Sequence, residues 1–477
     1  MSSLIYISLA VILQLLICNV TLAKLKTDYP EPPAIFEANE FTKWKALKSG
    51  SSRRADVNVP FTNKDNEADN IHLYRLDLVG DAATRGYDFG ALMANEIREF
   101  INTALPNYFK SMLPGKINTD KLPEALQKLL DHATTEKLAD FAWKAMWWVY
   151  QNELEYMPKE YVTEMEQMAV GMCSRLGPSC NVTEWDQAIK TVNMLPELVR
   201  MACTAYGAWG DANVNNPSGS GGLVQVRALD FGNGPFVNYT IVATYRDNDN
   251  SADPIFTTVT FPGMVGSITG MSDKGVAISE KVWMTSGTKK DLQPGNYHGI
   301  PDVFMLRHVL QNAKTKEEAI QYAQDAKRTW AIFMGVGDFT SQKFNLVAYS
   351  QDAAVPYDDT NIGQVTSMPY IKDVCYVDQH PQPSTDPSLP QALNDFYGEI
   401  SQENSRQVVQ YHKTGDVHIA VYDYKARSFL LSIGRVNGDG AYHPDGMDDS
   451  TSDGRDYWMA YNRPYVRFQL DDLAVGN

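Results

Sequence analysis

The segment CTAYGAWGDANVNNPSGSGGLVQVRALDFG, residues 203–232, has the pattern of a β-hairpin that begins at a cysteine. Cys203 starts one strand, a Ser/Gly-rich turn spans residues 218–222, and the second strand carries Arg227 and Asp230. Because antiparallel neighbours lie about 5 Å apart, the hairpin can bring Arg227 and Asp230 back beside Cys203. A guanidinium near a thiol favours the thiolate, and a carboxylate can hold an amine. The alternative interpretation is an ordinary Arg–Asp pair beside a buried cysteine.

The number of cysteines limits the role of Cys203. One cysteine lies in an N-terminal segment that we expect to be removed, which leaves Cys173, Cys180, Cys203 and Cys375. The short loop CSRLGPSC makes a bridge between Cys173 and Cys180 the economical prediction. Cys203 and Cys375 then either pair with each other or leave at least one free thiol. We favour a free Cys203, because large secreted enzymes need few disulfides.

The first 23 residues have the features of a cleaved signal peptide. Residues 4–16 are apolar and uncharged, and residues 21–23 (Thr-Leu-Ala) end in the small residue that signal peptidase requires. The apolar run is too short to span a bilayer comfortably, and we predict no later transmembrane span. N-x-[ST] sequons at Asn181 and Asn238 agree with passage through the secretory pathway. The sequence therefore predicts a secreted or lysosomal glycoprotein.

The composition is that of a large folded protein with an acidic surface. The 477 residues are 44% hydrophobic, and their formal net charge is -16 at pH 7. Nucleic acids and anionic membranes bind basic patches, so this charge argues against both as partners. It also suits an acidic compartment, where protonation of carboxylates reduces their repulsion. The chain is long enough for one large or two ordinary domains.

Three regions follow the predicted signal peptide (residues 1–23). Residues 24–70 are polar with scattered prolines, and we expect them to form an irregular leader. Residues 71–202 open with the strand-like sequence IHLYRLDLVGD and are then mainly helical, whereas residues 203–477 carry most of the β-branched runs. Strands grouped with helical layers predict an α+β, layered fold.

Other motifs indicate neither a metal site nor a different nucleophile. The sequence contains no C-x-x-C pair, H-E-x-x-H, G-x-S-x-G or complete G-x-G-x-x-G. The Asp/Gly-rich residues 437–456 lack the glycine at the sixth position of an EF-hand loop, and we expect a solvated loop. An aromatic run at helical spacing predicts core packing, with an acyl-chain pocket as the alternative: Trp143, Met146, Trp147 and Tyr150. We predict neither a metal nor a cofactor.

Four segments occur in an order that resembles the N-terminal nucleophile (Ntn) hydrolases. Cys-Thr-Ala at Cys203, followed by VRALDFG, resembles the start of their catalytic chain. GDAATRGYDFGALMANEI (residues 80–97) is similar to the Gly-rich helix start upstream, and two further segments resemble hairpins: GMSDKGVAISE (270–280) and GDVHIAVYDYKARSFLLSIG (415–434). The nearest groups are the acyl-coenzyme A:isopenicillin N acyltransferases, acid ceramidase with N-acylethanolamine acid amidase, and choloylglycine hydrolase. The resemblance extends from about residue 72 to the C-terminus.

This resemblance implies a four-layer αββα sandwich with a largely helical N-terminal part and a precursor that cuts itself. The thiol of Cys203 would attack the carbonyl of Ala202, and water would then release the new N-terminus. The products would be two associated chains, residues 24–202 and 203–477. Cleavage would give Cys203 an α-amine with a pKa of roughly 7.7 to 8.0, low enough to act as the base for its own thiol.

The resemblance also implies an amidohydrolase that needs no cofactor. Cys203 would form a thioester with an N-acyl substrate, a small acylated molecule such as a lipid, and water would complete the hydrolysis. Arg227 would orient the thiol or the substrate, and Asp230 would hold the α-amine. Two alternatives stay open: a phospholipase B-like esterase or acyltransferase, and a non-catalytic secreted glycoprotein on the same fold.

Two departures from the family pattern concern the oxyanion hole. The segment GQVTSMPY (residues 363–370) places Ser367 where the relatives carry an asparagine. A serine can donate a hydrogen bond to an oxyanion but has a shorter reach. A second expected asparagine is missing, and its place falls near Glu280, Lys281 or Val282. The sequence therefore predicts the nucleophile and leaves the oxyanion donors open, with Ser367 as the candidate.

Overall fold

The computed structural model describes residues 29–45, 52–62, 66, 68–112, 122–131, 135–199, 201–232, 234–247, 254–285, 297–436 and 457–474. The predicted signal peptide and the Asp/Gly-rich residues 437–456 lie outside this part of the chain. None of the helices in the described ranges combines the length and the apolar character needed to cross a membrane.

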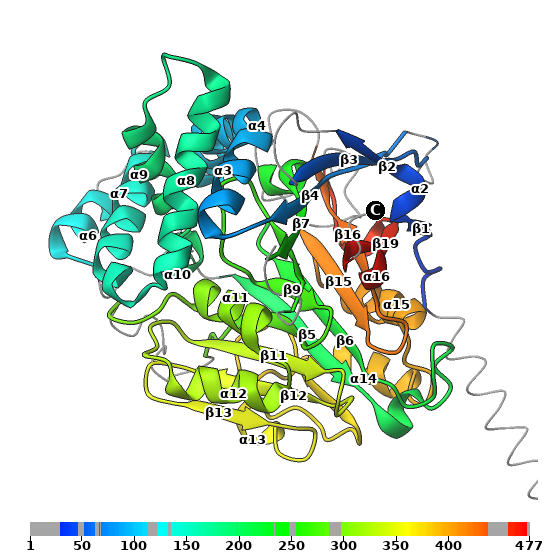
Figure 1. The fold of residues 1–477 in the computed structure, drawn as a ribbon. Coiled ribbons are helices and arrows are strands. Elements are labelled where there is room, and N and C mark those ends of the chain that lie inside the picture. Colours follow the sequence, from blue (N-terminus) through cyan, green and yellow to red (C-terminus); the bar gives the residue numbers. More distant parts are fainter. Residues whose placement is uncertain are drawn as a thin grey trace, which may run out of the picture.

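Two large sheets carry most of the strands (Figure 1). The seven-stranded sheet has the order β1 (Ile35–Glu37), β19 (Tyr465–Gln469), β16 (Ser428–Ile433), β15 (His418–Asp423), β6 (Val224–Asp230), β5 (Ala202–Ala208), β14 (Val374–Val377). The ten-stranded sheet has the order β13 (Ala354–Tyr357), β12 (Phe344–Tyr349), β11 (Ile332–Asp338), β10 (Val276–Val282), β9 (Thr269–Ser272), β8 (Phe256–Thr260), β7 (Ile241–Arg246), β4 (Ile71–Val79), β3 (Arg53–Val59), β2 (Thr42–Lys45). The short strands β17 (Arg435–Val436) and β18 (Tyr457–Trp458) pair separately. Most neighbours within the two sheets are antiparallel; β1–β19 and β4–β7 are parallel.

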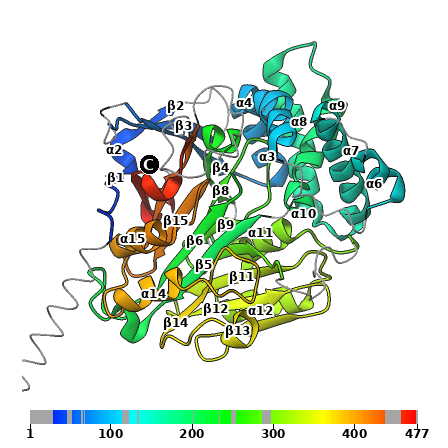
Figure 2. The ribbon, with the colours of Figure 1, turned by 180° about the vertical axis from the view of Figure 1, so that it is seen from behind.

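Most of the helices lie on the two outer faces of the sheets (Figures 1 and 2). Those before Cys203 are α2 (Ala38–Phe41), α3 (Ala82–Leu92), α4 (Ala94–Glu99), the π-helix Phe100–Ala104, α5 (Leu105–Met112), α6 (Glu124–Asp131), α7 (Thr135–Glu153), α8 (Lys159–Leu176), α9 (Val182–Val192) and α10 (Leu195–Leu198). Those after it are α11 (Asp302–Asn312), α12 (Lys316–Asp325), α13 (Gly363–Thr366), α14 (Ser388–Asp395), α15 (Gln402–His412) and α16 (Leu470–Ala474). Short 3₁₀ turns occur at Leu154–Tyr156, Gly210–Asn213, Pro235–Tyr239 and Ala460–Asn462.

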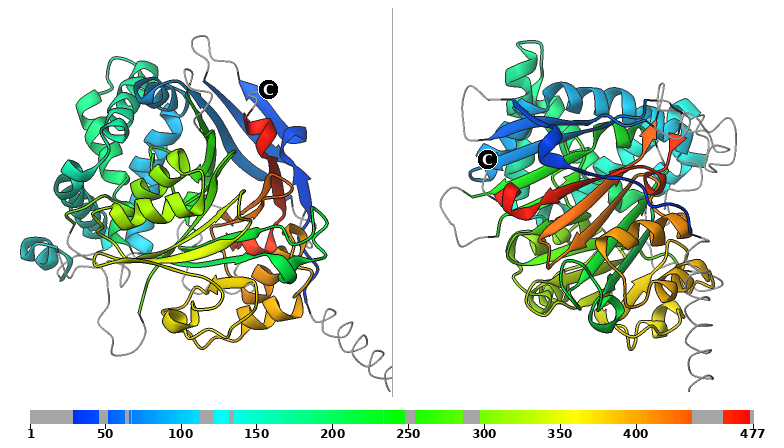
Figure 3. Two further views of the ribbon diagram at one scale, coloured as in Figure 1. Left: turned by 60° about the horizontal axis from the view of Figure 1, so that its bottom comes forward. Right: turned by 90° about the vertical axis from the view of Figure 1, so that its right-hand side faces the viewer.

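Three apolar cores lie between four layers of helices and strands. Figure 3 shows the layers from two further sides. The middle core joins the inner faces of the two sheets, with Ala205 and Ala420 from one and Ala277 and Phe333 from the other. A second core packs the ten-stranded sheet against the N-terminal helices and α11, and the third packs the seven-stranded sheet against α14 and α15. The fold is therefore α+β with the αββα order of layers.

Residues 35–45 and 52–59 differ from the irregular leader that the sequence predicts. The strand Arg53–Val59 alternates buried and more exposed side chains, and it pairs with β2 and β4 at the edge of the ten-stranded sheet. Ala55, Val57 and Val59 are fully buried. The period-two pattern is short and lies among charged residues, which is why its strand character is weak in the sequence.

The helical part before Cys203 is interrupted near its end. Asn181 caps α9, which ends at Val192, and the side chain of Asn193 bonds to the loop of residues 263–265 instead of continuing the helix. The short helix α10 follows, and β5 begins at Ala202. The chain therefore changes from helix to strand directly before Cys203, as the sequence predicts.

Candidate active site

Cys203 lies near the start of β5, in the interior of the seven-stranded sheet. It faces Leu229 on β6, and Ala205 faces Arg227 in the same pairing. Since side chains alternate along a strand, Cys203, Ala205 and Arg227 point to the same side, toward the ten-stranded sheet. Cys203 and Cys375 are both free and buried, so the predicted free thiol is confirmed. The hairpin of residues 203–232 thus forms the scaffold that its sequence indicates.

The guanidinium of Arg227 connects the thiol to three further groups. Its Nη2 donates to Sγ of Cys203 over 3.5 Å and to Oε2 of Glu280 over 3.0 Å. Its Nε donates to the backbone oxygen of Glu280 over 3.3 Å, and its Nη1 lies 3.0 Å from Nε2 of His418. Arg227 and Glu280 are both fully buried. This planar fork therefore has a fixed orientation at the thiol, which a flexible ammonium could not adopt.

His418 is in the neutral tautomer that carries its proton on Nδ1. An arginine can only donate, so Nε2 of His418 must accept from Arg227. The Oγ1 atom of Thr269 lies 2.9 Å from the same nitrogen. Burial and the charge of Arg227 both lower the pKa of His418 well below its usual value. His418 thus holds the guanidinium as an uncharged acceptor, and it is not a base for Cys203.

The thiol of Cys203 also contacts a carboxyl group. Sγ lies 3.8 Å from Oε2 of Glu280, in donor geometry. Burial raises the pKa of Cys203, and the opposing effect of Arg227 is smaller. Burial likewise raises the pKa of Glu280, against the effect of Arg227. In the uncut chain the site is therefore a buried thiol, guanidinium and carboxyl group in mutual contact.

Asp230 lies on the other face of the same hairpin. It is opposite Ala202, and its oxygens accept from the backbone nitrogens of Gly415 at 2.6 Å and Asp416 at 3.2 Å. Oδ2 lies 2.6 Å from Oγ1 of Thr414. Burial, and then the neighbouring carboxylate of Asp416, raises its pKa. Asp230 thus lies opposite Ala202, and none of the hydrogen bonds among the described residues joins it to the thiol.

The structure separates Ser367 from Cys203. Ser367 is exposed at the end of α13, in a left-handed conformation with a φ of 58°, and no contact among the described residues links it to Cys203 or Arg227. Its role as an oxyanion donor remains a prediction.

Gln379 carries an amide side chain close to β5. The pairing of β14 with β5 extends to Val377, which lies opposite Ala205, and Gln379 follows in a bend. Its Oε1 lies 3.4 Å from Oγ1 of Thr204, the residue after Cys203. The preceding Asp378 accepts from His380, Gln382 and Ser384, which fixes this turn. Gln379 was not predicted from the sequence, although its place shortly after a short apolar strand was the available signal.

A mainly apolar cavity lies near Cys203. Its volume is about 40 Å³, and Leu229, Phe261 and Ile268 are among the residues that line it. Leu229 pairs with Cys203 across the hairpin. The segment before Cys203 forms part of the cavity wall through Leu195, Pro196 and Met201.

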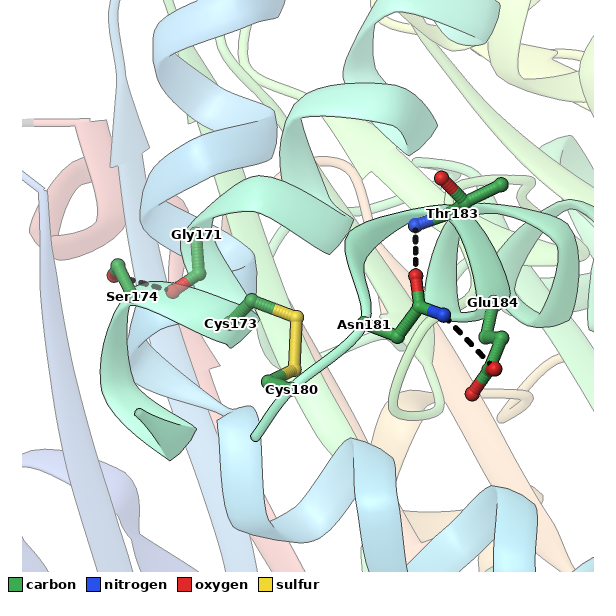
Figure 4. The surroundings of a disulfide bond; sticks show 7 residues. All are labelled: Gly171, Cys173, Ser174, Cys180, Asn181, Thr183 and Glu184. Atoms are coloured by element: carbon green, nitrogen blue, oxygen red, sulfur yellow. Dashed lines mark hydrogen bonds between the residues drawn. A yellow bond between two sulfur atoms is a disulfide. The ribbon is translucent and has the colours of Figure 1, made fainter. Parts of the chain in front are cut away.

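Cys173 and Cys180 form the predicted disulfide, with Cα atoms 5.2 Å apart (Figure 4). Both sequon asparagines are exposed, Asn181 at the start of α9 and Asn238 on a 3₁₀ turn. Asn181 Nδ2 donates to Glu184 over 2.8 Å. The bridge therefore closes the loop that leads into α9, and glycosylation stays a prediction.

Two further expectations concern the core and metals. Met146 and Tyr150 are buried in the core beneath the N-terminal helices, and Trp143 and Trp147 pack against it, so the prediction of core packing is confirmed. Within the described ranges, no group of three or more His, Cys, Asp or Glu side chains could hold a metal ion.

Comparison with known proteins places the chain among relatives of similar extent. A sequence model of the family described as acyl-coenzyme A:6-aminopenicillanic acid acyl-transferase matches residues 214–367. Protein dcd1B of Dictyostelium discoideum is 30% identical over 386 residues, which cover 78% of this chain and 69% of dcd1B. Protein dcd1A of the same organism is 29% identical over 378 residues, which cover 76% of this chain and 79% of dcd1A.

Solved structures give a weaker likeness. The Caenorhabditis elegans N-acylethanolamine-hydrolyzing acid amidase ortholog superposes with a TM-score of 0.34 and 17% identity, covering 47% of this chain and 93% of that chain. Penicillin V acylase from Agrobacterium tumefaciens superposes with a TM-score of 0.28 and 12% identity, covering 48% of this chain and 83% of that chain. The relationship to dcd1B thus covers more of this chain than either structural likeness.

Proposed function

The chain belongs to one family with dcd1B, among the N-terminal nucleophile hydrolases of the acyl-coenzyme A:6-aminopenicillanic acid acyl-transferase type, and we propose from this that it is a self-processing cysteine amidohydrolase. The observation that carries the proposal is the contact of Cys203 Sγ with both Arg227 and Glu280 in a buried site. A structural cysteine does not require a guanidinium and a carboxyl group at its sulfur.

In the first step the chain cuts itself between Ala202 and Cys203. Glu280, in its ionised form, accepts the thiol proton, and Sγ attacks the carbonyl carbon of Ala202. The carbon–sulfur bond forms, the peptide carbon–nitrogen bond breaks, and the proton passes to the departing amine of Cys203. Water then hydrolyses the thioester, which frees the carboxylate of Ala202 and restores the thiol.

In the second step the new N-terminus acts on an external substrate. The α-amine of Cys203 takes over as base, and Asp230, which adjoins Ala202 across the hairpin, stabilises its protonated form. Sγ attacks the acyl carbon of an amide and expels the amine, leaving a thioester that water hydrolyses. Gln379 is our candidate for the amide that stabilises the oxyanion, and Arg227 holds the thiol in position.

The cavity supports our proposal for the substrate class. Its lining is mainly apolar, and three of its residues belong to the segment before the proposed cleavage site, Leu195, Pro196 and Met201. Movement of this segment after cleavage would enlarge a space for an acyl chain. We therefore propose a lipid-like N-acyl amide as substrate, with the secretory pathway or lysosome as the location. The disulfide Cys173–Cys180 supports an oxidising compartment.

Acyl transfer is the second candidate, because the matching family model describes an acyltransferase. The two differ only in whether water or an acceptor amine takes the acyl group from the thioester. Incubation of an N-acyl amide with and without added amines, followed by product analysis, separates them.

The test of the proposed function is the chemical state of the purified protein. Mass spectrometry should find a fragment whose N-terminus is Cys203, and denaturing gels should show two fragments. Cys203→Ala should remain one chain and have no turnover, whereas Cys203→Ser should be much slower in both reactions. A wild-type chain that stays intact and is active, or a Cys203→Ala protein that still turns over, would contradict the proposal. An intact, inactive chain would support the non-catalytic alternative.

A further inference from the structure

Three carboxyl groups meet in the interior, outside the site described above. They belong to Glu153 at the end of α7, Glu197 on α10 and Asp302 at the start of α11. Glu153 and Glu197 are fully buried, and Asp302 is 1% exposed. Their elements come from both sides of Cys203 in the sequence. The cluster therefore joins the N-terminal helical part to the β-rich part.

The hydrogen bonds of the cluster are incomplete. Glu197 accepts from the backbone nitrogen of Asp302 at 2.7 Å and from Oγ1 of Thr329 at 3.0 Å. Asp302 accepts from the backbone nitrogen of Val303 at 2.7 Å. Within the described ranges, no N–H or hydroxyl group donates to either carboxyl oxygen of Glu153, whose side chain lies within hydrogen-bonding reach of the carboxyl group of Glu197. A buried carboxylate without donors is strongly disfavoured, whereas a neutral carboxyl group is tolerated.

No positive charge compensates the three groups. None of the ion pairs found in the described part of the chain includes Glu153, Glu197 or Asp302. The nearest guanidinium, that of Arg328 beside Tyr349, donates to backbone oxygens of residues 323–326 and 350.

The other titratable groups that face the cluster are acidic or neutral. The charge of Glu280 raises the pKa of Asp302, and Tyr349 on β12 interacts electrostatically with all three carboxyl groups. The hydroxyl of Tyr297 lies 3.5 Å from the backbone oxygen of Glu197. His298, beside Tyr297, is exposed. Ionisation of the cluster would therefore place like charges together in the interior.

Burial is the largest cause that raises the pKa of each of the three groups. The charge of Asp302 raises the pKa of Glu153 further, that of Glu153 raises the pKa of Glu197, and that of Glu197 raises the pKa of Asp302. Each group thus disfavours ionisation of the next, and the folded chain keeps protons that an unfolded chain would release.

We propose that Glu153, Glu197 and Asp302 form a proton-dependent latch, which holds α7 and α10 to α11 when protonated and loosens when it loses its protons. α10 ends four residues before Ala202, so the latch holds the segment that leads to the scissile bond. This inference goes beyond the proposed function and does not depend on self-cleavage.

The direction of the pH effect follows from proton binding. In the unfolded chain these groups release protons near pH 3.9 to 4.3, roughly the values of free Asp and Glu. The folded chain keeps its protons to higher pH. The latch is therefore complete below about pH 4 and is lost as pH rises toward the raised pKa values. Each retained proton makes the unfolding equilibrium constant grow about tenfold per pH unit in this window.

The experiment measures the denaturant-induced unfolding of the full chain between pH 4 and pH 8. It uses Cys203→Ala protein as background, so that the result is independent of whether the wild-type chain cuts itself. Glu153→Gln removes one titrating group at nearly constant size. For each pH unit, the unfolding equilibrium constant of Glu153→Gln should rise by a factor that is about ten times smaller than the factor for the background. Glu155→Gln, an exposed glutamate two residues away, is the matched control and should leave the slope unchanged.

Equal pH slopes for Glu153→Gln and the background would overturn the latch. If Glu153→Gln does not fold, the infrared band of protonated carboxyl groups decides the question in folded Cys203→Ala protein with and without Glu197→Gln. At pH 6, where exposed carboxyl groups are ionised, the band should be stronger without Glu197→Gln, because Asp230 and Glu280 contribute to both proteins. An equal band in the two folded proteins would overturn the proposal.

Discussion

The Nη2 atom of Arg227 lies 3.5 Å from Sγ of Cys203, and the same nitrogen lies 3.0 Å from Oε2 of Glu280. One buried donor therefore serves both the nucleophile and the carboxyl group beside it. The remaining nitrogens of Arg227 are held by the backbone of Glu280 and by His418. The position of the thiol consequently depends on a planar group with several fixed contacts.

Arg227→Lys should lower the rates of self-cleavage and turnover on the order of a hundredfold or more. A single ammonium cannot reach Cys203, Glu280 and His418 together, so it leaves buried acceptors without donors. The measurements are kcat with an N-acyl amide and the half-time of fragment formation. Arg307→Lys is the matched control, because Arg307 is another fully buried arginine, paired with Glu164 at 2.6 Å. If both variants lose stability and only Arg227→Lys loses turnover, Arg227 positions the thiol. Unchanged turnover in Arg227→Lys would mean that Arg227 only forms a structural ion pair.

Asp230→Asn should have opposite effects on activity and on stability. Asn can keep the bonds from Gly415 and Asp416, while its Nδ2 donates to Thr414, whose hydroxyl can turn toward Thr204 at 2.8 Å. The variant loses the charge that holds the α-amine, so turnover should fall on the order of a hundredfold.

The stability change follows from the raised pKa of Asp230 in the uncut chain. Because this pKa is raised, the contribution of Asp230 to the free energy of unfolding is fully present below about pH 3.9 and is lost as pH rises. In a Cys203→Ala background, Asp230→Asn should therefore lose less stability between pH 4 and pH 7 than the background does. Denaturant midpoints at both pH values measure this difference. Unchanged turnover of Asp230→Asn in the processed enzyme would exclude the amine-binding role.

Gln379→Ala and Ser367→Ala distinguish the two candidates for the oxyanion donor. Removal of one such donor commonly lowers kcat on the order of a hundredfold to a thousandfold. We expect this loss for Gln379→Ala, because Gln379 contacts Thr204, the residue after Cys203. Ser367→Ala should retain wild-type kcat, since Ser367 is exposed at the end of α13. The reverse result would restore the assignment made from the sequence.

The sequence predicted those parts of the site that depend on local signals. Cys203, Arg227 and Asp230 lie on one hairpin whose strands and turn can be recognised within thirty or so residues. Glu280 and His418 reach the same site from positions 77 residues after Cys203 and 191 residues after Arg227. Contacts of that kind depend on how the two sheets are stacked, which no local pattern encodes.

Gln379 was missed for a related reason. It lies in the turn after β14, and its contact with Thr204 depends on how β14 pairs with β5, which no local pattern encodes. The face of Asp230 was also unresolved, because the sequence predicts a hairpin without fixing whether Cys203 pairs with an even or odd position of β6. The pairing Cys203 with Leu229 places Arg227 on the side of the thiol and Asp230 on the other.

Replacement of Cys173 and Cys180 by serine should lower the free energy of unfolding by about 2 to 3 kcal/mol, because the bridge closes a loop between residues separated by 7 in sequence. Turnover should be unaffected, because neither residue contacts the active site. Denaturant unfolding measures the change. Added reductant should destabilise the wild-type protein to the level of the variant and leave the variant unchanged. Equal stability of the two proteins without reductant would show that the bridge contributes nothing to folding.

Ile268→Trp should shift the substrate preference toward shorter acyl chains. Ile268 lines the cavity beside Leu229, and the larger ring would occupy space that we assign to the acyl chain. Each methylene kept out of the cavity costs about 0.8 kcal/mol, or roughly fourfold in kcat/KM. We therefore expect a long-chain amide to lose at least tenfold, while a two-carbon acyl amide keeps its wild-type kcat/KM. Ile320→Trp, at another half-buried isoleucine that does not line the cavity, is the matched control and should preserve the ratio. An equal loss for long and short substrates in Ile268→Trp would mean that the acyl chain binds elsewhere.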